Sequence, residues 1–554
     1  MSGDMTWSSR AVAAALVMLF VACGGNDCEQ PSPDADAEED FQEDVESEPD
    51  TIEDPDAPEP DAVEDTTEED GGPDAPLPVD CSAIVEYVTR ESLLVHLEAL
   101  DTIAAENGGT RVAGSPGWEA SIDYVETSMG DYGYVTTRQA ATYPYFEETT
   151  DPVMEMISPS SHAYTFSPDD PEVMTGDFER MHLSRPGDVT AEVEAVDLQL
   201  WPGNTSNSGC ETADFTGFTV GHIALLQRGT CGFSSKALNA DAAGAAAVII
   251  FNQGDTTARE GLMLGGCQMT AMVPSDPEHG VGIPVVFASY AVGAGIAALL
   301  SSGPVVMHVQ VSDVFDIRTS QNLLAETAAG DPDDIVFYGA HLDSDPDSPG
   351  MNDDASGIAT VLEIARVVSE CDPLRMLRFG FWSTEEWRRP WGSLQYLDSL
   401  GDTDRDRISM YFNVDMIASP NYAVFVLDGD GSDFWVPGPE GSAELEWFFT
   451  VNLMLQGYPT LPLWATGSDH WSFFMNDIPY GMAFAGAGFP EDIKTEEEAA
   501  LFGGTAGEKY DPCHHEPCDT LDNVNMDIAG SLAGVYVSSA QFFGIDGMSV
   551  PPLP

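Results

Sequence analysis

Apolar runs of strand length alternate with helical patterns from Asn322 onward, and this alternation constrains the fold of the 554-residue chain most. Strands are predicted at Ile335–Gly339, Leu377–Trp382, Ser409–Val414 and Ala423–Leu427. Helices are predicted at Gly357–Ser369, from about Ser393, and at Ser468–Met475. Continuous apolar strands separated by helices are typical of an open, mostly parallel sheet covered by helices on both faces. The sequence therefore predicts an α/β fold for this half.

Reactive side chains follow the predicted strands of this sheet. His341, Glu386 and Asp415 each come just past the carboxyl end of a strand. Open α/β sheets bind their ligands beyond those ends. We therefore expect these three residues to lie at one edge of the sheet.

Two further motifs add potential metal ligands between the strands. In His341-Leu342-Asp343, the imidazole can bind a metal while the Asp343 carboxylate accepts its other N–H and orients the ring. In the NDDASG stretch at 352–357, Asp353 can bridge two cations. The simpler interpretation of each motif alone is a structural histidine and a solvated acidic turn.

Adjacent carboxylates at a buried strand end are harder to explain without a cation. Glu385 and Glu386 would repel each other there unless a positive charge lay nearby. Burying the Asp415 carboxylate unpaired would cost several kcal/mol, so a cation or an arginine must compensate its negative charge. One of the two glutamates can bind metal while Glu385 moves protons, as in metal-assisted hydrolysis with two ions about 3.5–4 Å apart. His515 completes a set of two histidines and three carboxylates.

Cysteine usage indicates an oxidising compartment. Nine cysteines are present, and setting Cys23 aside leaves eight, an even number in a chain with an export signal. Cys513 with Cys518 would pin the loop that contains His515, and Cys210 with Cys231 is a second predicted pair, with Cys267 as a competitor. Sequence spacing assigns no partners to the remaining three, Cys28, Cys81 and Cys371.

The N-terminal 80 residues predict export rather than folded structure. Arg10 precedes an apolar run, 11–22, that is too short to span a bilayer and is typical of a signal peptide. The residues before Cys23, Phe20-Val21-Ala22, resemble the lipobox of bacterial lipoproteins, which implies lipidation at Cys23; an ordinary cleaved signal is the alternative.

Residues 24–80 hold 24 Asp or Glu and no Lys or Arg, so an extended acidic tether is expected there. A calcium-binding or regulatory tail is the alternative. The net charge of −76 makes nucleic acid and anionic membrane surfaces poor partners.

The remaining segments predict helices before the sheet and a separate β-rich insertion. Helical spacing of apolar residues runs from Cys81 to Leu100, a second helix is expected at Trp118–Met129, and a strand at Tyr134–Thr142. The insertion, 160–312, mixes short strands with one small helical unit. Its elements are expected at Ala191–Leu200, His222–Leu226, Lys236–Gly244 and Ala247–Phe251.

The order of these motifs resembles the M28 family of di-zinc metallopeptidases. Besides His341-x-Asp343, NDDASG, Glu385-Glu386 and Asp415, the resemblance rests on DPCHHEPC at 511–518 and RVAGSPGWEASIDYVE at 111–126. It is nearest to the secreted bacterial aminopeptidase S and leucyl aminopeptidase type. The stretch 215–252, beginning FTGFTVGHIALLQRGTCGF, resembles a protease-associated (PA) domain. The implied organisation is a signal peptide at 1–23, a tether at 24–80, a zinc-exopeptidase domain at 81–159 and 313–546, and a PA domain at 160–312.

The resemblance implies a role for each residue of the site. His341 and Asp415 would hold one zinc ion, Glu386 and His515 the other, and Asp353 would bridge them. Glu385 would be the general base and then the general acid. The peptide bond after Asp353 is expected to be cis, as in many relatives.

Two positions depart from the family pattern. His514 stands where secreted relatives often carry a tyrosine that binds the oxyanion, and an imidazole can donate the same hydrogen bond. The turn at 387–393 after Glu386 is one residue longer than usual. Because of these two departures, the shape of the pocket wall beside Glu386 and the substrate preference are not predicted.

The predicted function is an exported, lipid-anchored aminopeptidase of the cell envelope with two zinc ions per chain and peptides as substrates. A glutamate-carboxypeptidase-like enzyme is the first alternative, for which Arg388 and Arg389 are the only nearby arginines. A catalytically inactive surface lipoprotein and a one-zinc glutaminyl-cyclase-like transferase are the others. The preferred side chain, the role of the PA domain and the oligomeric state are not predicted.

Overall fold

The computed structural model describes residues 79–550 except for 148, 169–175, 182–183, 264–271, 274–275, 388 and 490–491. The predicted signal peptide, Cys23, Cys28, residues 24–78 of the acidic tether, Cys267 and Arg388 lie outside these residues. The described part is built around a six-stranded and an eight-stranded sheet. The six-stranded sheet comprises β1 (Thr136–Glu147), β12 (Val314–Glu326), β13 (Asp331–His341), β14 (Arg375–Trp382), β15 (Ile408–Asn413) and β18 (Tyr480–Gly481).

The six-stranded sheet is mostly parallel, as predicted. Its order is β1-β12-β14-β13-β15-β18, and the last four strands run parallel to one another. β12 runs antiparallel to both of its neighbours, β1 and β14. The register pairs His341 with Trp382 and Gly339 with Asn413, so β14, β13 and β15 end together at one edge.

Helices cover both faces of this sheet. On β13, Phe337 contacts Tyr396 and Phe473, whereas the next side chain, Tyr338, stacks on Phe412. Because successive strand side chains point to opposite faces, these contacts separate two layers. The Phe337 face is covered by α6 (Trp391–Ser399) and α9 (His470–Phe474). The Tyr338 face is covered by α1 (Arg90–Glu106), α2 (Pro116–Asp131), α5 (Ala355–Val368), α8 (Ser442–Leu455) and α11 (Met526–Ser539).

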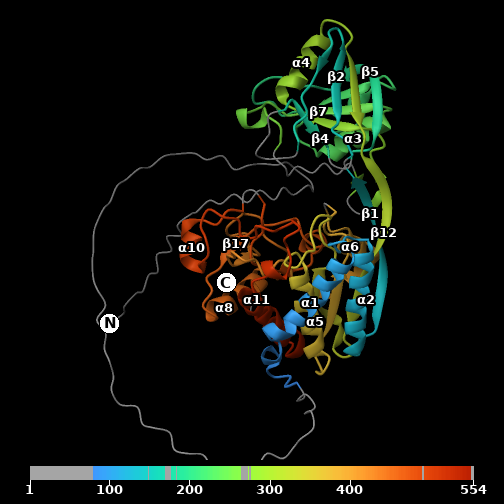
Figure 1. Ribbon diagram of the computed structural model, residues 1–554. Coiled ribbons are helices and arrows are strands. Elements are labelled where there is room, and N and C mark those ends of the chain that lie inside the picture. Colours follow the sequence, from blue (N-terminus) through green and yellow to red (C-terminus); the bar gives the residue numbers. More distant parts are fainter. Residues whose placement is uncertain are drawn as a thin grey trace, which may run out of the picture. The chain divides into compact units, whose positions relative to one another are not determined.

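The first helix begins later than the apolar spacing predicts. A 3₁₀ turn occupies Ile84–Tyr87, and α1 begins at Arg90 instead of near Cys81. Thr89 caps α1 in a reciprocal capping box with Ser92, which satisfies backbone N–H groups and fixes the start. In Figure 1, α1, α2 and α5 lie together along the six-stranded sheet.

The remaining elements of this part are short. They are α7 (Asp402–Arg405), α10 (Glu496–Phe502), a 3₁₀ turn at Leu521–Asn523, and a small sheet of β16 (Phe425–Leu427), β17 (Leu461–Leu463) and β19 (Ala483–Phe484). The 3₁₀ turns at Thr212–Phe215 and Thr257–Arg259 lie in the segment of the eight-stranded sheet. A π-helical turn, Ala540–Ile545, extends α11. The stretch 526–545 is long and apolar enough to cross a membrane, but most of it is buried, and α11 packs on α5 and α8 as a core helix.

The predicted β-rich segment, 160–312, supplies every strand of the eight-stranded sheet except β2, which lies before residue 160. The order of this sheet is β3-β2-β11-β5-β6-β7-β10-β4, with β5, β6, β7 and β10 parallel. The strands are β2 (Val153–Ser158), β3 (His162–Ala163), β4 (Phe178–Arg180), β5 (Gly187–Ala195), β6 (Ile223–Gln227), β7 (Ala247–Phe251), β10 (Val285–Ala288) and β11 (Val306–Val311). Helices α3 (Phe233–Ala242) and α4 (Tyr290–Leu300) accompany it, and β8 (Met272–Val273) pairs with β9 (Asp276–Gly280). β5 ends at Ala195, five residues before the predicted end.

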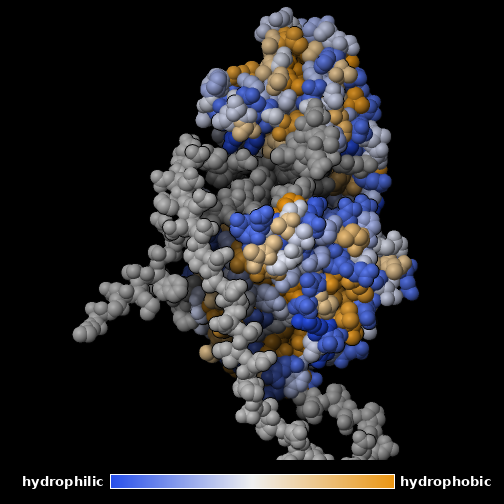
Figure 2. All heavy atoms as spheres, turned by 60° about the vertical axis from the view of Figure 1, so that its left-hand side comes forward, coloured by the Kyte–Doolittle hydropathy of each residue, from blue (hydrophilic) through white to orange (hydrophobic). Residues whose placement is uncertain are grey.

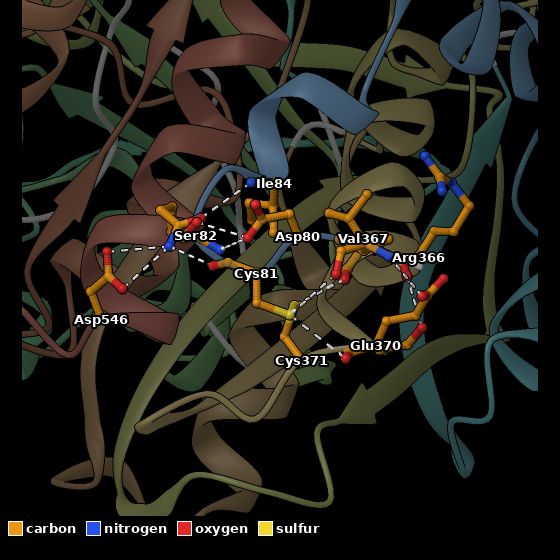
Figure 3. Close-up of a disulfide and its surroundings, with 12 residues drawn as sticks. Asp80, Cys81, Ser82, Ile84, Arg366, Val367, Glu370, Cys371 and Asp546 are labelled. Atoms are coloured by element: carbon orange, nitrogen blue, oxygen red, sulfur yellow. Dashed lines mark hydrogen bonds between the residues drawn. A yellow bond between two sulfur atoms is a disulfide. The ribbon is translucent and has the colours of Figure 1, made fainter. Parts of the chain in front are cut away.

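Three disulfides are present in the described part of the chain. Both predicted pairs form, Cys210–Cys231 and Cys513–Cys518. The third, which the sequence left unassigned, joins Cys81 to Cys371 across 290 residues (Figure 3). Backbone groups reinforce this link, because Val79 N–H donates to the Glu370 carboxylate at 3.1 Å and the Gln541 amide donates to the Cys81 carbonyl at 2.8 Å.

The described surface is suited to an aqueous surrounding. Figure 2 shows hydrophilic residues spread over the face drawn, with hydrophobic residues between them in smaller groups. The acidic excess of the whole chain, 95 Asp and Glu against 19 Lys and Arg, favours solubility in the same way.

Candidate metal centre

Three neighbouring parallel strands deliver the first candidate ligands to one edge of the sheet. His341 is the last residue of β13, Glu386 follows the end of β14 by four residues, and Asp415 follows the end of β15 by two. Because β14, β13 and β15 are adjacent and end in register, their carboxyl ends meet. The predicted juxtaposition of these residues is therefore observed.

Asp353 is held at the centre of this edge by the loop between β13 and α5. Its N–H donates to the Asp519 carboxylate at 3.2 Å, and the N–H of Asn352 donates to the same carboxylate at 2.9 Å. Asp354 caps α5 by accepting the N–H of Gly357 at 2.8 Å. The bond between Asp353 and Asp354 is cis, as the resemblance implied.

One group of candidate ligands forms around His341. Its Nε2 lies 3.0 Å from Asp353 Oδ1 and 3.7 Å from Asp415 Oδ1. Its Nδ1 lies 3.1 Å from the backbone carbonyl oxygen of Asp343, to which it donates. A carbonyl oxygen only accepts, so the proton of the neutral ring is on Nδ1 and the lone pair is on Nε2, aimed at the carboxylates.

The predicted role of the Asp343 carboxylate as the acceptor for His341 is wrong. That carboxylate stays 3.9 Å from Nδ1, since the backbone carbonyl of the same residue is nearer. Its oxygens accept the backbone N–H groups of Glu385 at 3.2 Å and Glu386 at 3.4 Å instead. Asp343 therefore shapes the turn that presents both glutamates.

A second group of candidate ligands forms around His515. Its Nε2 lies 3.3 Å from Asp353 Oδ2 and 3.1 Å from Glu386 Oε2. Glu386 and His515 also form a compact group with Asp345, a residue that sequence reasoning missed. Each oxygen of Asp353 thus faces a different histidine, one in each group.

Buried oxygen atoms that lack a hydrogen-bond partner test whether these residues fit cations. Asp415 Oδ1 and Glu386 Oε1 are buried and have no hydrogen-bond partner in the structure. Buried polar atoms in proteins are nearly always paired. These two unpaired carboxylate oxygens, together with the nearby imidazole nitrogens, form a donor set that divalent metals satisfy.

The ionisation of the site points the same way. In the metal-free chain, burial raises the pKa of Glu386 to about 8, opposed by His515 and reinforced by Asp353. Burial also raises the pKa of Glu385 well above its usual range, with Glu386 and Asp415 adding to the shift. So many carboxylates in one buried space cannot all ionise without compensating positive charge.

A chain of hydrogen bonds fixes the Asp415 carboxylate from behind. Trp382 Nε1 donates to Tyr411 OH at 3.0 Å, and Tyr411 OH donates to Asn413 Oδ1 at 3.0 Å. Asn413 Nδ2 donates to Ser468 Oγ at 2.8 Å, and Ser468 donates to Asp415 Oδ2 at 2.5 Å. All five residues are buried. Oδ2 of Asp415 accepts the hydrogen bond from Ser468, whereas Oδ1 of Asp415 has no hydrogen-bond partner and can bind a cation.

A buried arginine holds the loop between His341 and Asp353. Arg111, in the RVAGSPG stretch, donates to the carbonyl oxygens of Pro349 at 3.0 Å and Gly350 at 2.7 Å, and to that of Leu342. Its side chain is fully buried. Arg111 therefore acts on the shape of this loop rather than on a substrate.

The C-terminal loop places two histidines at the site. His515 has a φ of 59° inside the Cys513–Cys518 loop, and its side chain is 34% exposed. His514 is more buried, at 5%, and its Nε2 lies 3.1 Å from Asp353 Oδ2. In the longer turn after Glu386, Trp387 packs its ring against Tyr143 and Tyr145.

Comparison with known proteins places the chain in a family. The model of peptidase family M28 matches residues 322–538, and the model of the PA domain matches 189–296. An aminopeptidase of Pseudomonas aeruginosa is 40% identical over 437 residues, covering 79% of this chain and 77% of the relative. Leucine aminopeptidase 2 of Arthroderma otae is 32% identical over 468 residues, covering 84% and 86%.

A solved structure agrees with these relatives. The aminopeptidase from Aneurinibacillus sp. strain AM-1 superposes with a TM-score of 0.56 at 25% identity, covering 86% of this chain and 99% of that one. The sequence relatives and the fold therefore point to the same assignment. The chain belongs to peptidase family M28, as a metallo-aminopeptidase with a PA domain inserted into its sequence.

Proposed function

We propose that this M28 aminopeptidase is exported and removes N-terminal residues from peptides with the help of two zinc ions. The observation that carries the proposal is the position of Asp353, whose two oxygens face two separate histidines. A bridging carboxylate between two ligand groups is the arrangement that a pair of ions about 3.5–4 Å apart requires.

Ligand chemistry supports zinc. His341 with Asp415 would hold one ion and His515 with Glu386 the other, with Asp353 between them. Imidazole nitrogen mixed with carboxylate oxygen suits zinc better than magnesium or calcium, which prefer oxygen alone. Bound there, two zinc ions supply Lewis acids for the scissile carbonyl and for the attacking water.

Glu385 is proposed as the group that moves protons. Its backbone N–H is held by Asp343, and its side chain is buried beside Glu386 and His341. As general base Glu385 accepts a proton from the attacking water, and as general acid it gives that proton to the leaving amine.

The direction of cleavage follows from the charge of the site. Carboxylates beyond those assigned to the ions, such as Asp345, attract the protonated α-amine of a peptide and repel a C-terminal carboxylate. The printed names of the relatives, aminopeptidase and leucine aminopeptidase 2, describe removal of N-terminal residues by those proteins.

Export is proposed on two grounds. Three disulfides in the described part of the chain form and persist in oxidising compartments. The apolar run before Cys23 has the length of a signal peptide. Lipidation at Cys23 would anchor the chain to the cell envelope, and labelling with a fatty-acid analogue in the native chain and in Cys23→Ala tests this anchor.

A panel of amino-acid p-nitroanilides, with and without a chelator, tests the proposed activity. We expect hydrolysis of substrates with a free α-amine, loss of activity with the chelator, and recovery on adding zinc. Peptides with a blocked N-terminus are the matched control. Cleavage of only the blocked peptides would favour the carboxypeptidase alternative, and no cleavage together with less than one zinc per chain would favour the binding lipoprotein.

A further inference from the structure

His514 is the feature of the site that departs most from the family pattern, and its side chain is not on the surface. Its ring is 5% exposed, and its Nε2 lies 3.1 Å from Asp353 Oδ2. His515 Nε2 lies 3.3 Å from that same oxygen. Two imidazole nitrogens thus converge on one oxygen of the proposed bridging carboxylate.

We infer that His514 is a direct ligand of the second zinc ion, which gives that ion two imidazoles instead of one. This inference rests on the proposed two-zinc function and adds one residue to it.

The distances are those of neighbouring ligands on one ion. Zinc bonds of about 2.0–2.2 Å in near-tetrahedral geometry place neighbouring ligand atoms roughly 3.3 Å apart. The separations around Asp353 Oδ2, 3.1 and 3.3 Å, fall close to this value. The ligand atoms of Asp353, His514 and His515 also form one group within 4.8 Å of one another. A cation at the centre of that group contacts all three.

The surroundings of His514 hold its ring in this position. The ring of Phe489 packs edge-on against the ring of His514, with centroids 4.7 Å apart. The centroid of the His515 ring lies 3.8 Å from that of His514. Gly488 leaves room for the loop, because a Cβ there would lie 1.9 Å from the Asp511 carbonyl and 2.8 Å from His514 Cβ. The Cys513–Cys518 disulfide closes the same loop.

Two groups of candidate ligands meet at His515 on this side of Asp353. Glu386 forms a group with Asp345 and His515, whereas Asp353 forms its group with His514 and His515. His514 supplies a nitrogen on the Asp353 side of the second site, away from Glu386. A second imidazole there increases the preference of this site for zinc over the oxygen-seeking magnesium and manganese.

The alternative role of His514 is a hydrogen bond from its N–H to Asp353 Oδ2 or to a substrate oxygen. In that role the imidazole has no bond to metal, and its replacement by tyrosine would preserve the donor. The two roles therefore differ in a property that is measured on the bound metal itself.

Counting the imidazoles on the metal tests the inference in the full native chain. The protein is labelled with ¹⁵N-histidine and loaded with ¹¹³Cd, and nitrogens bonded to cadmium are recognised by scalar coupling. We expect three coupled imidazoles, from His341, His515 and His514, and about 1.5 imidazoles per ion by X-ray absorption of the zinc form. His514→Phe should remove one coupling and weaken one of the two zinc sites, in chelator competition, by more than the roughly 10- to 100-fold that loss of a group supporting a ligand costs.

His96→Phe is the matched control, since it removes a buried imidazole that contacts Tyr124 and Glu363 instead of the site. Two bound ions with only two coupled imidazoles in the native chain would overturn the role of His514 and leave the two-zinc proposal standing. Fewer than two bound ions would overturn the two-zinc proposal itself. If His514→Phe fails to fold, the coupling count in the native chain still decides.

Discussion

Ser468→Ala should weaken metal binding at the site of His341 and Asp415, although it replaces none of the proposed ligands. The Ser468 hydroxyl donates to Asp415 Oδ2 at 2.5 Å and accepts from Asn413 at 2.8 Å, so the substitution removes one charge-assisted hydrogen bond and leaves a buried amide without its acceptor. A hydrogen bond to a charged group contributes about 1.5–3 kcal/mol.

That energy sets the upper limit of the loss in metal affinity, because only the part that differs between the bound and unbound chain affects binding. Each 1.4 kcal/mol is about tenfold in a dissociation constant, so about 1.5–3 kcal/mol corresponds to a loss of roughly 10- to 150-fold. Measured losses for groups that support a metal ligand, about 10- to 100-fold, cover the same range. We therefore expect zinc to leave one site of Ser468→Ala at a chelator concentration that leaves the native chain loaded.

The assay is competition for zinc with a chromogenic chelator, followed by metal analysis of the dialysed protein. Ser539→Ala is the matched control, because Ser539 is also buried and bonds Tyr338 and the Tyr536 carbonyl on the other face of the sheet. Ser468→Thr keeps a hydroxyl and should restore most of the affinity. Equal zinc affinity in Ser468→Ala and the native chain, or an equal loss in Ser539→Ala, would refute the reasoning.

Three further predictions follow from the site and the disulfides. Glu385→Gln should keep two zinc ions bound but reduce turnover by several orders of magnitude, because the amide cannot accept the proton; near-normal turnover would remove Glu385 from the mechanism. Cys513→Ser should weaken zinc binding by about 10- to 100-fold in chelator competition, since the loop that presents His515 loses its closure; an unchanged zinc dissociation constant would contradict this role. Replacing Cys81 and Cys371 together by serine should lower the free energy of unfolding by about 2–5 kcal/mol in denaturant titration, and an unchanged midpoint would show that the link adds nothing to stability.

The sequence predicts the centre of the sheet well because buried parallel strands have continuous apolar runs. The predicted strands match β14 and β15 within two residues, whereas β13 extends beyond the predicted Ile335–Gly339 at both ends, and the common edge of the three follows from parallel pairing. It is this edge that brings His341 and Asp415 together from positions more than seventy residues apart.

Features that depend on contacts between distant segments could not be predicted. Ser468, which lies two residues before α9, donates a hydrogen bond to Asp415, and no spacing in the sequence predicts that pair. The acceptor for His341 depends on a backbone carbonyl, which every residue carries. Cys81 and Cys371 could not be paired because they are 290 residues apart, with the whole eight-stranded sheet and the β1, β12 and β13 strands between them in the chain.

The Cys81–Cys371 link also determines what happens when the polypeptide is cut. A single protease nick at any point between these two cysteines, the whole PA match at 189–296 included, leaves two fragments that remain covalently joined. Such a nicked molecule runs as one band on a non-reducing gel and as two after reduction. The chain can therefore lose the continuity of its backbone at such a site while its two fragments stay joined.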